Sequence, residues 1–168
     1  MAVSLHWTNI PTIKDASWKT FNHVLTVTER GLKQVVLIPC LWKDTAPQVA
    51  EKLRHLGSPS SIVSDRDTKF TSVFWKSMCD IMEIKMQMTS PLHPQANGAG
   101  ERTNQTMKHV LWTREEASEA ASTNWLLRLD FVEIAINNAP IADTELSPFY
   151  LNLRYHLLRH PPTWMRSF

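Results

Sequence analysis

The N-terminal part of the chain carries short runs of hydrophobic and β-branched residues, a pattern that is typical of β-strands. The runs cover Val3 to Thr8, His23 to Glu29 and Lys33 to Pro39. Arg30-Gly31-Leu32 makes a tight connection between the last two runs. We therefore expect a meander of three strands at the start of the domain.

A helix and a fourth strand are predicted next. The segment from Ala46 to Leu56 has the pattern of a short helix, and Gly57 and Pro59 are signals for its end. Ser61 to Ser64 then reads as a short buried strand. This order places the following residue, Asp65, at the C-terminal end of a strand.

A second helix is predicted from Thr71 or Ser72, either of which can cap it, to about Glu83. Its large apolar residues fall at positions i, i+4, i+7 and i+8, which share one helix face. They are Phe74, Met78, Ile81 and Met82. This stripe predicts the face of the helix that packs in the core.

The rest of the chain alternates a strand with helices. Lys85 to Thr89 alternates polar and apolar residues as a strand does, before Pro91 and Pro94 break the pattern. Helical patterns cover Glu101 to Trp112 and Asn124 to Asn138. One face of the last helix carries Trp125, Leu129, Val132 and Ile136. Strands first, helices later and an alternating middle indicate a mixed α/β domain.

Composition permits several functions without selecting one. The 168 residues are 43% hydrophobic and 20% charged, which suits one globular domain with a well-buried core. A net charge of +2 and a pI near 8.6 allow nucleic-acid binding but do not by themselves indicate it. The binding partner therefore has to be predicted from the motifs, because the net charge does not identify it.

Cysteine usage and hydropathy predict a soluble, intracellular protein with no membrane contact. Cys40 and Cys79 lack the short spacing of a zinc site, and a single distant pair is no disulfide framework. The longest apolar run, around Val35 to Trp42, is too short to span a bilayer and contains Pro39. The N-terminal residues also lack the pattern of a signal peptide.

Two acidic residues stand in distinctive surroundings. Asp65 leads the run Ser64-Asp65-Arg66-Asp67, and Glu101 opens a helix after the loop His93-Pro94-Gln95-Ala96-Asn97-Gly98. Carboxylates from a strand end and a helix start can together hold a divalent metal for phosphoryl transfer, because hard cations prefer oxygen ligands. The spacing of one Asp and one Glu is weak by itself, so the flanking residues decide the matter.

Those flanking residues form an ordered set of motifs. They are Ile62-Val63-Ser64-Asp65-Arg66-Asp67, Lys69-Phe70-Thr71-Ser72, Phe74-Trp75, His93-Pro94-Gln95, Glu101-Arg102-Thr103-Asn104-Gln105-Thr106, Asn137-Asn138 and Ser147-Pro148-Phe149. In this order the set resembles the catalytic core of integrases from gypsy-type long-terminal-repeat retrotransposons, over roughly Val3 to Pro162. The resemblance implies a ribonuclease H-like fold, with a mixed five-stranded sheet flanked by helices. It assigns 1–162 to the core-like domain and 163–168 to a C-terminal tail.

The resemblance also implies a triad of two Asp and one Glu that binds two Mg²⁺ or Mn²⁺ ions. Asp65 matches the second Asp and Glu101 the Glu, but His6 stands at the position of the first Asp, on the first strand. A neutral imidazole brings no charge and suits zinc or copper better than magnesium. We therefore expect weakened metal binding and impaired catalysis. His6 is either a substitute ligand or a strand residue whose ring is satisfied by a neighbour.

Further residues belong to the expected DNA surface. Asn104 and Lys108 lie at i+3 and i+7 from Glu101 and so share its helix face, where Lys108 can contact a DNA phosphate or remain a solvated lysine. The seven tryptophans are scattered, and most are expected to be core or helix-packing residues. None is assigned to DNA.

The function indicated is metal-dependent DNA cleavage and strand transfer. The alternative is a catalytically silent remnant that binds nucleic acid or a partner, and a further alternative is a relic without a stable fold. The predicted helix after Thr45 is shorter than the family pattern, which also suggests drift from enzymatic function. By family analogy the partners are DNA and a second copy of the chain, with no small-molecule substrate, and the compartment is the nucleus.

Overall fold

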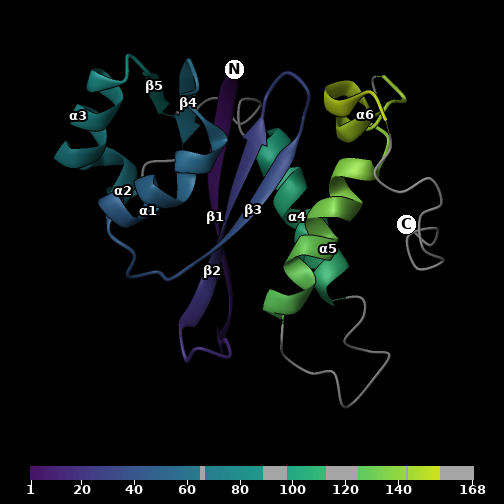
Figure 1. Ribbon diagram of the computed structural model, residues 1–168, viewed down its shortest axis with the longest axis horizontal. Helices are drawn as coiled ribbons and strands as arrows, with labels where there is room; N and C mark the ends of the chain where they lie inside the picture. Colours follow the sequence, from purple (N-terminus) through teal and green to yellow (C-terminus); the bar gives the residue numbers. More distant parts are fainter. Residues whose placement is uncertain (65–66, 89–97, 113–124, 143, 156–168) are drawn as a thin grey trace.

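The computed structural model describes residues 1–64, 67–88, 98–112, 125–142 and 144–155, with the backbone alone at 55, 98–101 and 112. Its centre is a five-stranded mixed sheet of order β3-β2-β1-β4-β5 (Figure 1). The sheet predicted from the sequence is therefore confirmed.

Three strands form the expected antiparallel meander: β1 (Ala2–Lys14), β2 (Thr20–Glu29) and β3 (Val35–Cys40). Two shorter strands, β4 (Ser61–Ser64) and β5 (Lys85–Met88), run parallel to β1 on its other side. Because β3, β1 and β4 run in the same direction, their C-terminal ends point toward the same end of the sheet.

The β1–β2 hairpin is longer than the sequence predicted. Its register shifts between Asn9 and Ile13, around Pro11, and pairing then continues to Lys14. The carbonyl of Pro11 accepts a hydrogen bond of 2.7 Å from the Trp125 indole. The proline interrupts the local alternation, and a contact from a distant helix supports the extension.

Helices cover both faces of the sheet, as Figure 1 shows. On one face lie α1 (Ala46–Leu53), with its short 3₁₀ continuation η1 (Arg54–Leu56), α2 (Thr68–Thr71) and α3 (Val73–Ile81). On the other lie α4 (Gly98–Trp112) and α5 (Trp125–Asn138), and α6 (Pro148–Leu153) packs against α5.

Two of these helices bear on the predictions from the sequence. The sequence did not predict α6 as a helix. The predicted stop at Gly57 is confirmed, with φ at +76°.

Alternation along the strands divides the core into two clusters. Leu5, Leu25 and Val27 are buried against α1 and α3, whereas Val24 and Ile10 are buried against α4 and α5. Successive side chains of a strand point to opposite faces, so the two clusters lie on opposite sides of one sheet. This assignment decides which strand residues can meet α4.

The predicted core face of α3 is wrong at Phe74, Ile81 and Met82, which are exposed, and is confirmed only at Met78, which packs against the core. Phe74 and Ile81 are 44% and 83% exposed, whereas Trp75 and Cys79, on the neighbouring face, are 0% and 1% exposed. The Trp75 ring packs edge-on against Phe70, 5.1 Å between ring centroids. Because the large Trp75 indole is buried in this contact, α3 is rotated so that the predicted apolar stripe does not face the core.

The core face predicted for α5 is confirmed at Trp125, Leu129 and Val132, each at most 3% exposed, while Ile136 is partly buried.

Side chains of α5 bond to the outer edge of β3, which is an edge strand of the sheet. Asn137, fully buried, accepts from the Val35 N–H at 2.7 Å and donates to the Val35 carbonyl at 2.6 Å. One turn earlier, Glu133 accepts from the Leu37 N–H at 2.7 Å. The helix thereby satisfies backbone groups that an edge strand otherwise exposes.

Candidate active site

His6 lies near the middle of the sheet, on the face that α4 and α5 cover. It occupies β1 between Ser4 and Thr8, which are buried on the same face, and its own exposure is only 7%. Its cross-strand partner is Thr26 of β2, which is fully buried. The position predicted for the first ligand is thus a buried site in the central strand.

The end of β4 lies beside this position. Ser64, the last residue of β4, pairs with Leu5, the residue before His6. Asp65 follows Ser64 directly in the sequence but lies outside the described residues, as does Arg66. The parallel pairing therefore brings the last residue of β4 beside the His6 segment of β1.

The first half of α4 approaches the same place from the other side. Glu101 is in the first turns of α4, where the structure describes its backbone but not its side chain. One turn later, Asn104 accepts a hydrogen bond of 2.7 Å from the Thr26 hydroxyl. Since Thr26 pairs with His6, this bond fixes α4 next to the His6 position. No motif includes Thr26, so its role was not predicted from the sequence.

Asn104 and Lys108 share a helix face, as predicted, but differ in their surroundings. Asn104 is half-buried with its side-chain oxygen bound to Thr26, and Lys108 is exposed. Met107, beside Lys108 in the sequence, is fully buried in the core on this side of the sheet. The helix therefore holds Lys108 at the surface while its neighbour anchors the helix to the sheet.

The described residues alone do not form a magnesium site. Among them no group of three or more His, Cys, Asp or Glu side chains is arranged to hold a metal. On this face they supply the His6 imidazole and the hydroxyls of Ser4, Thr8 and Thr26. Hard divalent cations bind mainly through carboxylate oxygens, and none of these side chains carries one.

A caged lysine lies on the opposite face of the sheet, shortly after Asp65 in the sequence. The Lys69 ammonium lies 4.6 Å from the Trp7 ring centroid, 4.1 Å from that of Trp42, and 3.6 Å from Asp67 Oδ1. Only 9% of Lys69 is exposed. Two aromatic faces and one carboxylate can stabilise a buried cation. The clustering of these side chains around Lys69 was not predicted from the sequence.

His23 borders the same cluster, with its ring 5.1 Å from Trp42 and 6.2 Å from Trp7 between centroids. Burial lowers the pKa of His23, and the positive charge of Lys69 lowers it further, while Asp67 acts in the opposite direction. The ring therefore favours the neutral state beside the lysine.

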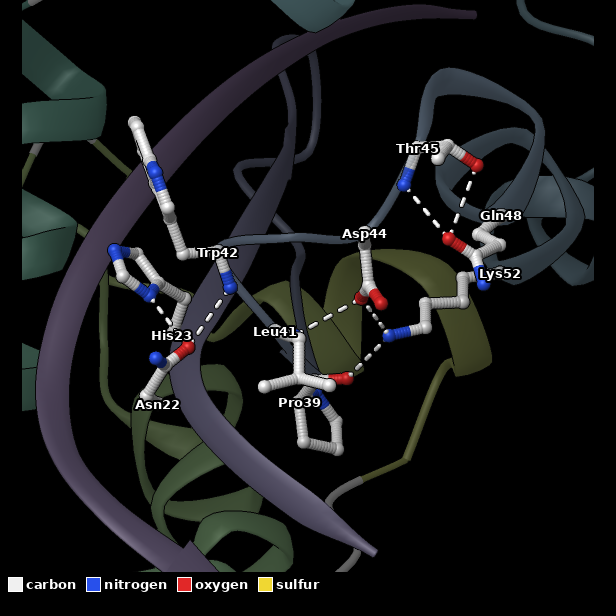
Figure 2. Close-up of polar contacts among 9 residues, drawn as sticks. All are labelled: Asn22, His23, Pro39, Leu41, Trp42, Asp44, Thr45, Gln48 and Lys52. Carbon is white, nitrogen blue, oxygen red and sulfur yellow. Dashed lines mark hydrogen bonds and ion pairs between the residues drawn. The ribbon is translucent and has the colours of Figure 1, made fainter.

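The loop between β3 and α1 is held by several polar contacts (Figure 2). The Asp44 carboxylate accepts from the Leu41 N–H at 2.9 Å and pairs with Lys52, which also donates to the Pro39 carbonyl at 3.0 Å. At its end, the Thr45 N–H donates to Gln48 at 2.7 Å. These bonds fix the loop at both ends.

A transposon polyprotein is similar to this chain in amino-acid sequence. No protein-family model matches the chain. The Transposon Tf2-3 polyprotein of Schizosaccharomyces pombe is 33% identical over 140 residues, which are 80% of this chain and 10% of the polyprotein. The chain thus spans about a tenth of the length of the curated relatives it matches.

Solved structures with the same fold are retroviral integrase cores. The catalytic core domain of BIV integrase matches with a TM-score of 0.68 and 18% identity, over 91% of this chain and 93% of that one. The HTLV-2 integrase catalytic core in complex with magnesium, in a trimeric form, matches with a TM-score of 0.64 and 15% identity, over 88% of this chain and 93% of that one. The expected ribonuclease H-like fold is confirmed.

Proposed function

The chain is an integrase core-like domain of the gypsy retrotransposon type, and we propose that it cuts and joins DNA, with activity that His6 weakens. One observation carries the proposal. Leu5 pairs with the end of β4, while Thr26, the partner of His6, bonds to α4 at Asn104. The strand that precedes Asp65 and the helix that contains Glu101 are therefore both fixed to the His6 region.

Asp65 and Glu101 are the proposed ligands of Mg²⁺ or Mn²⁺. A divalent cation held there would stabilise charge on the attacking and leaving oxygens of a phosphodiester. The attacking group is water in DNA cleavage and a DNA 3′-hydroxyl in strand transfer. The magnesium complex of the HTLV-2 core, a protein of the same fold, supports this choice of metal.

His6 is the proposed cause of weak activity. Its imidazole occupies a buried place in β1 where the family has a carboxylate, and it supplies one nitrogen and no negative charge. Magnesium binds nitrogen ligands poorly, so the third ligand of the triad is effectively lost. We propose that metal affinity, and with it turnover, falls for this reason.

Lys108 and Asn104 are the proposed contacts to DNA. Lys108 is exposed on the helix face of Glu101 and would bind a phosphate. Asn104 already accepts from Thr26, so its amide nitrogen is the donor that we assign to DNA. Charge reversal at Lys108 should weaken DNA binding without unfolding the chain, because the side chain is at the surface.

The assembly and the cellular setting are also proposals. A homodimer is supported by analogy with the HTLV-2 integrase core, which has been solved in dimeric and trimeric forms. Residues 1–162 are proposed as the functional unit, 163–168 as a tail, and the nucleus as the compartment. Across the part of the chain that the structure describes, no helix has the length and apolar character needed to cross a membrane.

A strand-transfer assay with Mg²⁺ or Mn²⁺ tests the proposal, with Asp65→Asn as the inactive control. We expect weak product from the parent and about tenfold or more from His6→Asp, which restores a carboxylate. The parent and the variants should have comparable thermal melts, so that a loss of product reports on chemistry. If neither the parent nor His6→Asp exceeds Asp65→Asn, the chain is not a DNA-joining enzyme.

A catalytically silent, DNA- or partner-binding remnant is the second candidate, and the burial of a histidine at the first ligand position favours it. It predicts product from His6→Asp but none from the parent. Metal titration separates the two candidates further: Mg²⁺ should raise the melting temperature of the parent if the parent is a weak enzyme, and should leave it unchanged if the parent is silent. It should raise the melting temperature of His6→Asp in both cases. Equal cleavage by both proteins would refute the claim that His6 impairs the site.

A further inference from the structure

We propose that Trp42 is a stacking platform for an unpaired DNA base, at the end of the sheet toward which the C-terminal ends of β3 and β4 both point. The proposal rests on the proposed function for its choice of DNA as ligand. Trp42 is 52% exposed, two residues after the end of β3, whose C-terminal end points the same way as that of β4. Trp42 belongs to no motif, and no tryptophan was predicted from the sequence to contact DNA.

Lys69 links Trp42 to the segment that follows Asp65 in the sequence. The Lys69 ammonium lies 4.1 Å from the Trp42 ring centroid. Lys69 also pairs with Asp67, two residues after Asp65 in the sequence. The indole is therefore linked, through one buried side chain, to the segment that follows the proposed metal ligand.

The backbone of Trp42 is held before any ligand arrives. Its N–H donates to Asn22 Oδ1 at 2.8 Å, and the same oxygen lies 2.9 Å from His23 Nδ1. The neighbouring Leu41 N–H is bound by Asp44, so the bonds in Figure 2 restrain both residues of the turn. A preorganised aromatic side chain loses little conformational entropy on binding, which favours its use as a contact surface.

The environment of the ring suits a base better than an apolar protein surface. The Lys69 ammonium lies over the indole and the His23 ring packs beside it, while about half of the residue is exposed to solvent. Lys43, the next residue, is exposed and can reach a phosphate of the same strand. An exposed aromatic ring with an adjacent lysine is the combination that binds single-stranded nucleic acid.

The chain contains a matched control in Trp18. Like Trp42, it is exposed, at 79%, is followed by a lysine, Lys19, and has a lysine ammonium over its ring, that of Lys14 at 5.3 Å. It differs in place, because it lies in the turn that closes the β1–β2 hairpin, past the last pair Lys14 and Thr20. Figure 1 shows this hairpin extending beyond the helices that cover the sheet.

The test measures binding of a fluorescein-labelled single-stranded oligonucleotide by anisotropy, in EDTA and low salt, so that no cleavage occurs. Trp42→Leu removes the aromatic ring and keeps an apolar side chain, and it should weaken binding about 5- to 150-fold. Trp42→Phe should stay within about threefold of the parent, and Trp18→Leu within about twofold. A blunt duplex should show a smaller loss for Trp42→Leu, because its bases are already stacked.

The outcomes separate this inference from the proposed function. If the parent binds the oligonucleotide and Trp42→Leu binds equally well, or Trp18→Leu loses as much, the stacking role is wrong and the proposed function stands. If strand transfer fails but Trp42→Leu still weakens binding, the stacking role stands in a silent DNA-binding domain. If the parent does not bind DNA at all, both proposals fall.

Discussion

The Thr26 hydroxyl donates a hydrogen bond of 2.7 Å to the side-chain oxygen of Asn104, and this contact joins the middle of the sheet to α4. Thr26 is fully buried and pairs with His6 across the strands. Asn104 lies one turn after Glu101. The bond therefore connects α4, which carries the last position of the candidate triad, to β2, the strand that pairs with the strand of the first position.

Replacing Thr26 by Val should destabilise the fold by about 1–3 kcal/mol, because the half-buried Asn104 oxygen loses its donor. Thr28→Val is the matched control. Thr28 lies on the same strand and face, and within the described residues its buried hydroxyl has no hydrogen-bond partner. Urea denaturation should show Thr28→Val near the parent or above it. Equal losses for both variants would mean that the Thr26–Asn104 bond contributes nothing specific.

Replacing Asn137 by Leu should cost about 2–4 kcal/mol, because both the N–H and the carbonyl of Val35 lose their partners at a buried strand edge. Asn138→Leu serves as the comparison. Its side-chain oxygen is buried without a hydrogen-bond partner among the described residues, so the change should be small. Thermal and urea unfolding measure both variants. A greater loss for Asn138→Leu would contradict this account of the β3 edge.

Glu133 should make stability fall as the pH rises above the ordinary carboxyl range. Burial raises the pKa of Glu133, the negative charge of Asp130 raises it further, and the Leu37 N–H acts against both. The folded state then holds this proton at a pH where the unfolded chain has released it, so ionisation disfavours folding. Glu133→Gln, which can still accept from Leu37, should lose this dependence and be more stable than the parent at neutral pH.

Unfolding measured from pH 4 to pH 8 tests the Glu133 prediction. Asp130→Asn is the control, because Asp130 is an exposed neighbour with a secondary effect on the Glu133 pKa. It should reduce the slope with pH less than Glu133→Gln does. A parent whose stability rises steadily across this range, with Glu133→Gln unchanged, would contradict the prediction.

The two cysteines should react slowly in the native protein. Cys40 and Cys79 are free and are 0% and 1% exposed. Burial raises the pKa of Cys40 to about 11, and it also raises that of Cys79. Thiolate at Cys40 is therefore about 100-fold scarcer than at an ordinary thiol, and steric protection adds to this. Reaction with a thiol reagent at pH 8, in the parent and in Cys79→Ser, should accelerate sharply in urea.

Local pattern was sufficient for much of the architecture. The strands Ser61–Ser64 and Lys85–Met88 fall within their predicted ranges, and the predicted face of α5 is the buried one. These elements obey periods of two and 3.6 residues, which neighbouring residues in the sequence express directly. For the same reason the ordered motifs indicated the integrase family before any geometry was known.

Other features depend on contacts between distant residues. The β1–β2 hairpin continues past Pro11, where its strands carry residues that pack against α5, and α3 turns the Trp75 face inward because Phe70 lies beside it. Neither contact has a signature in the local alternation, and a short helix has too few turns for its stripe to override such packing.

Residue type and spacing were sufficient to predict the order of the elements, the mixed sheet, the family motifs and the histidine in place of an acid at position 6. Packing between distant segments was needed to establish that Thr26 meets Asn104, that Lys69 is enclosed by Trp7 and Trp42, and that Trp42 and Trp18 are exposed while Trp75 is buried. These outcomes arise when distant segments compete for the same buried space and the same hydrogen-bond partners, and that competition is settled only when the whole chain packs.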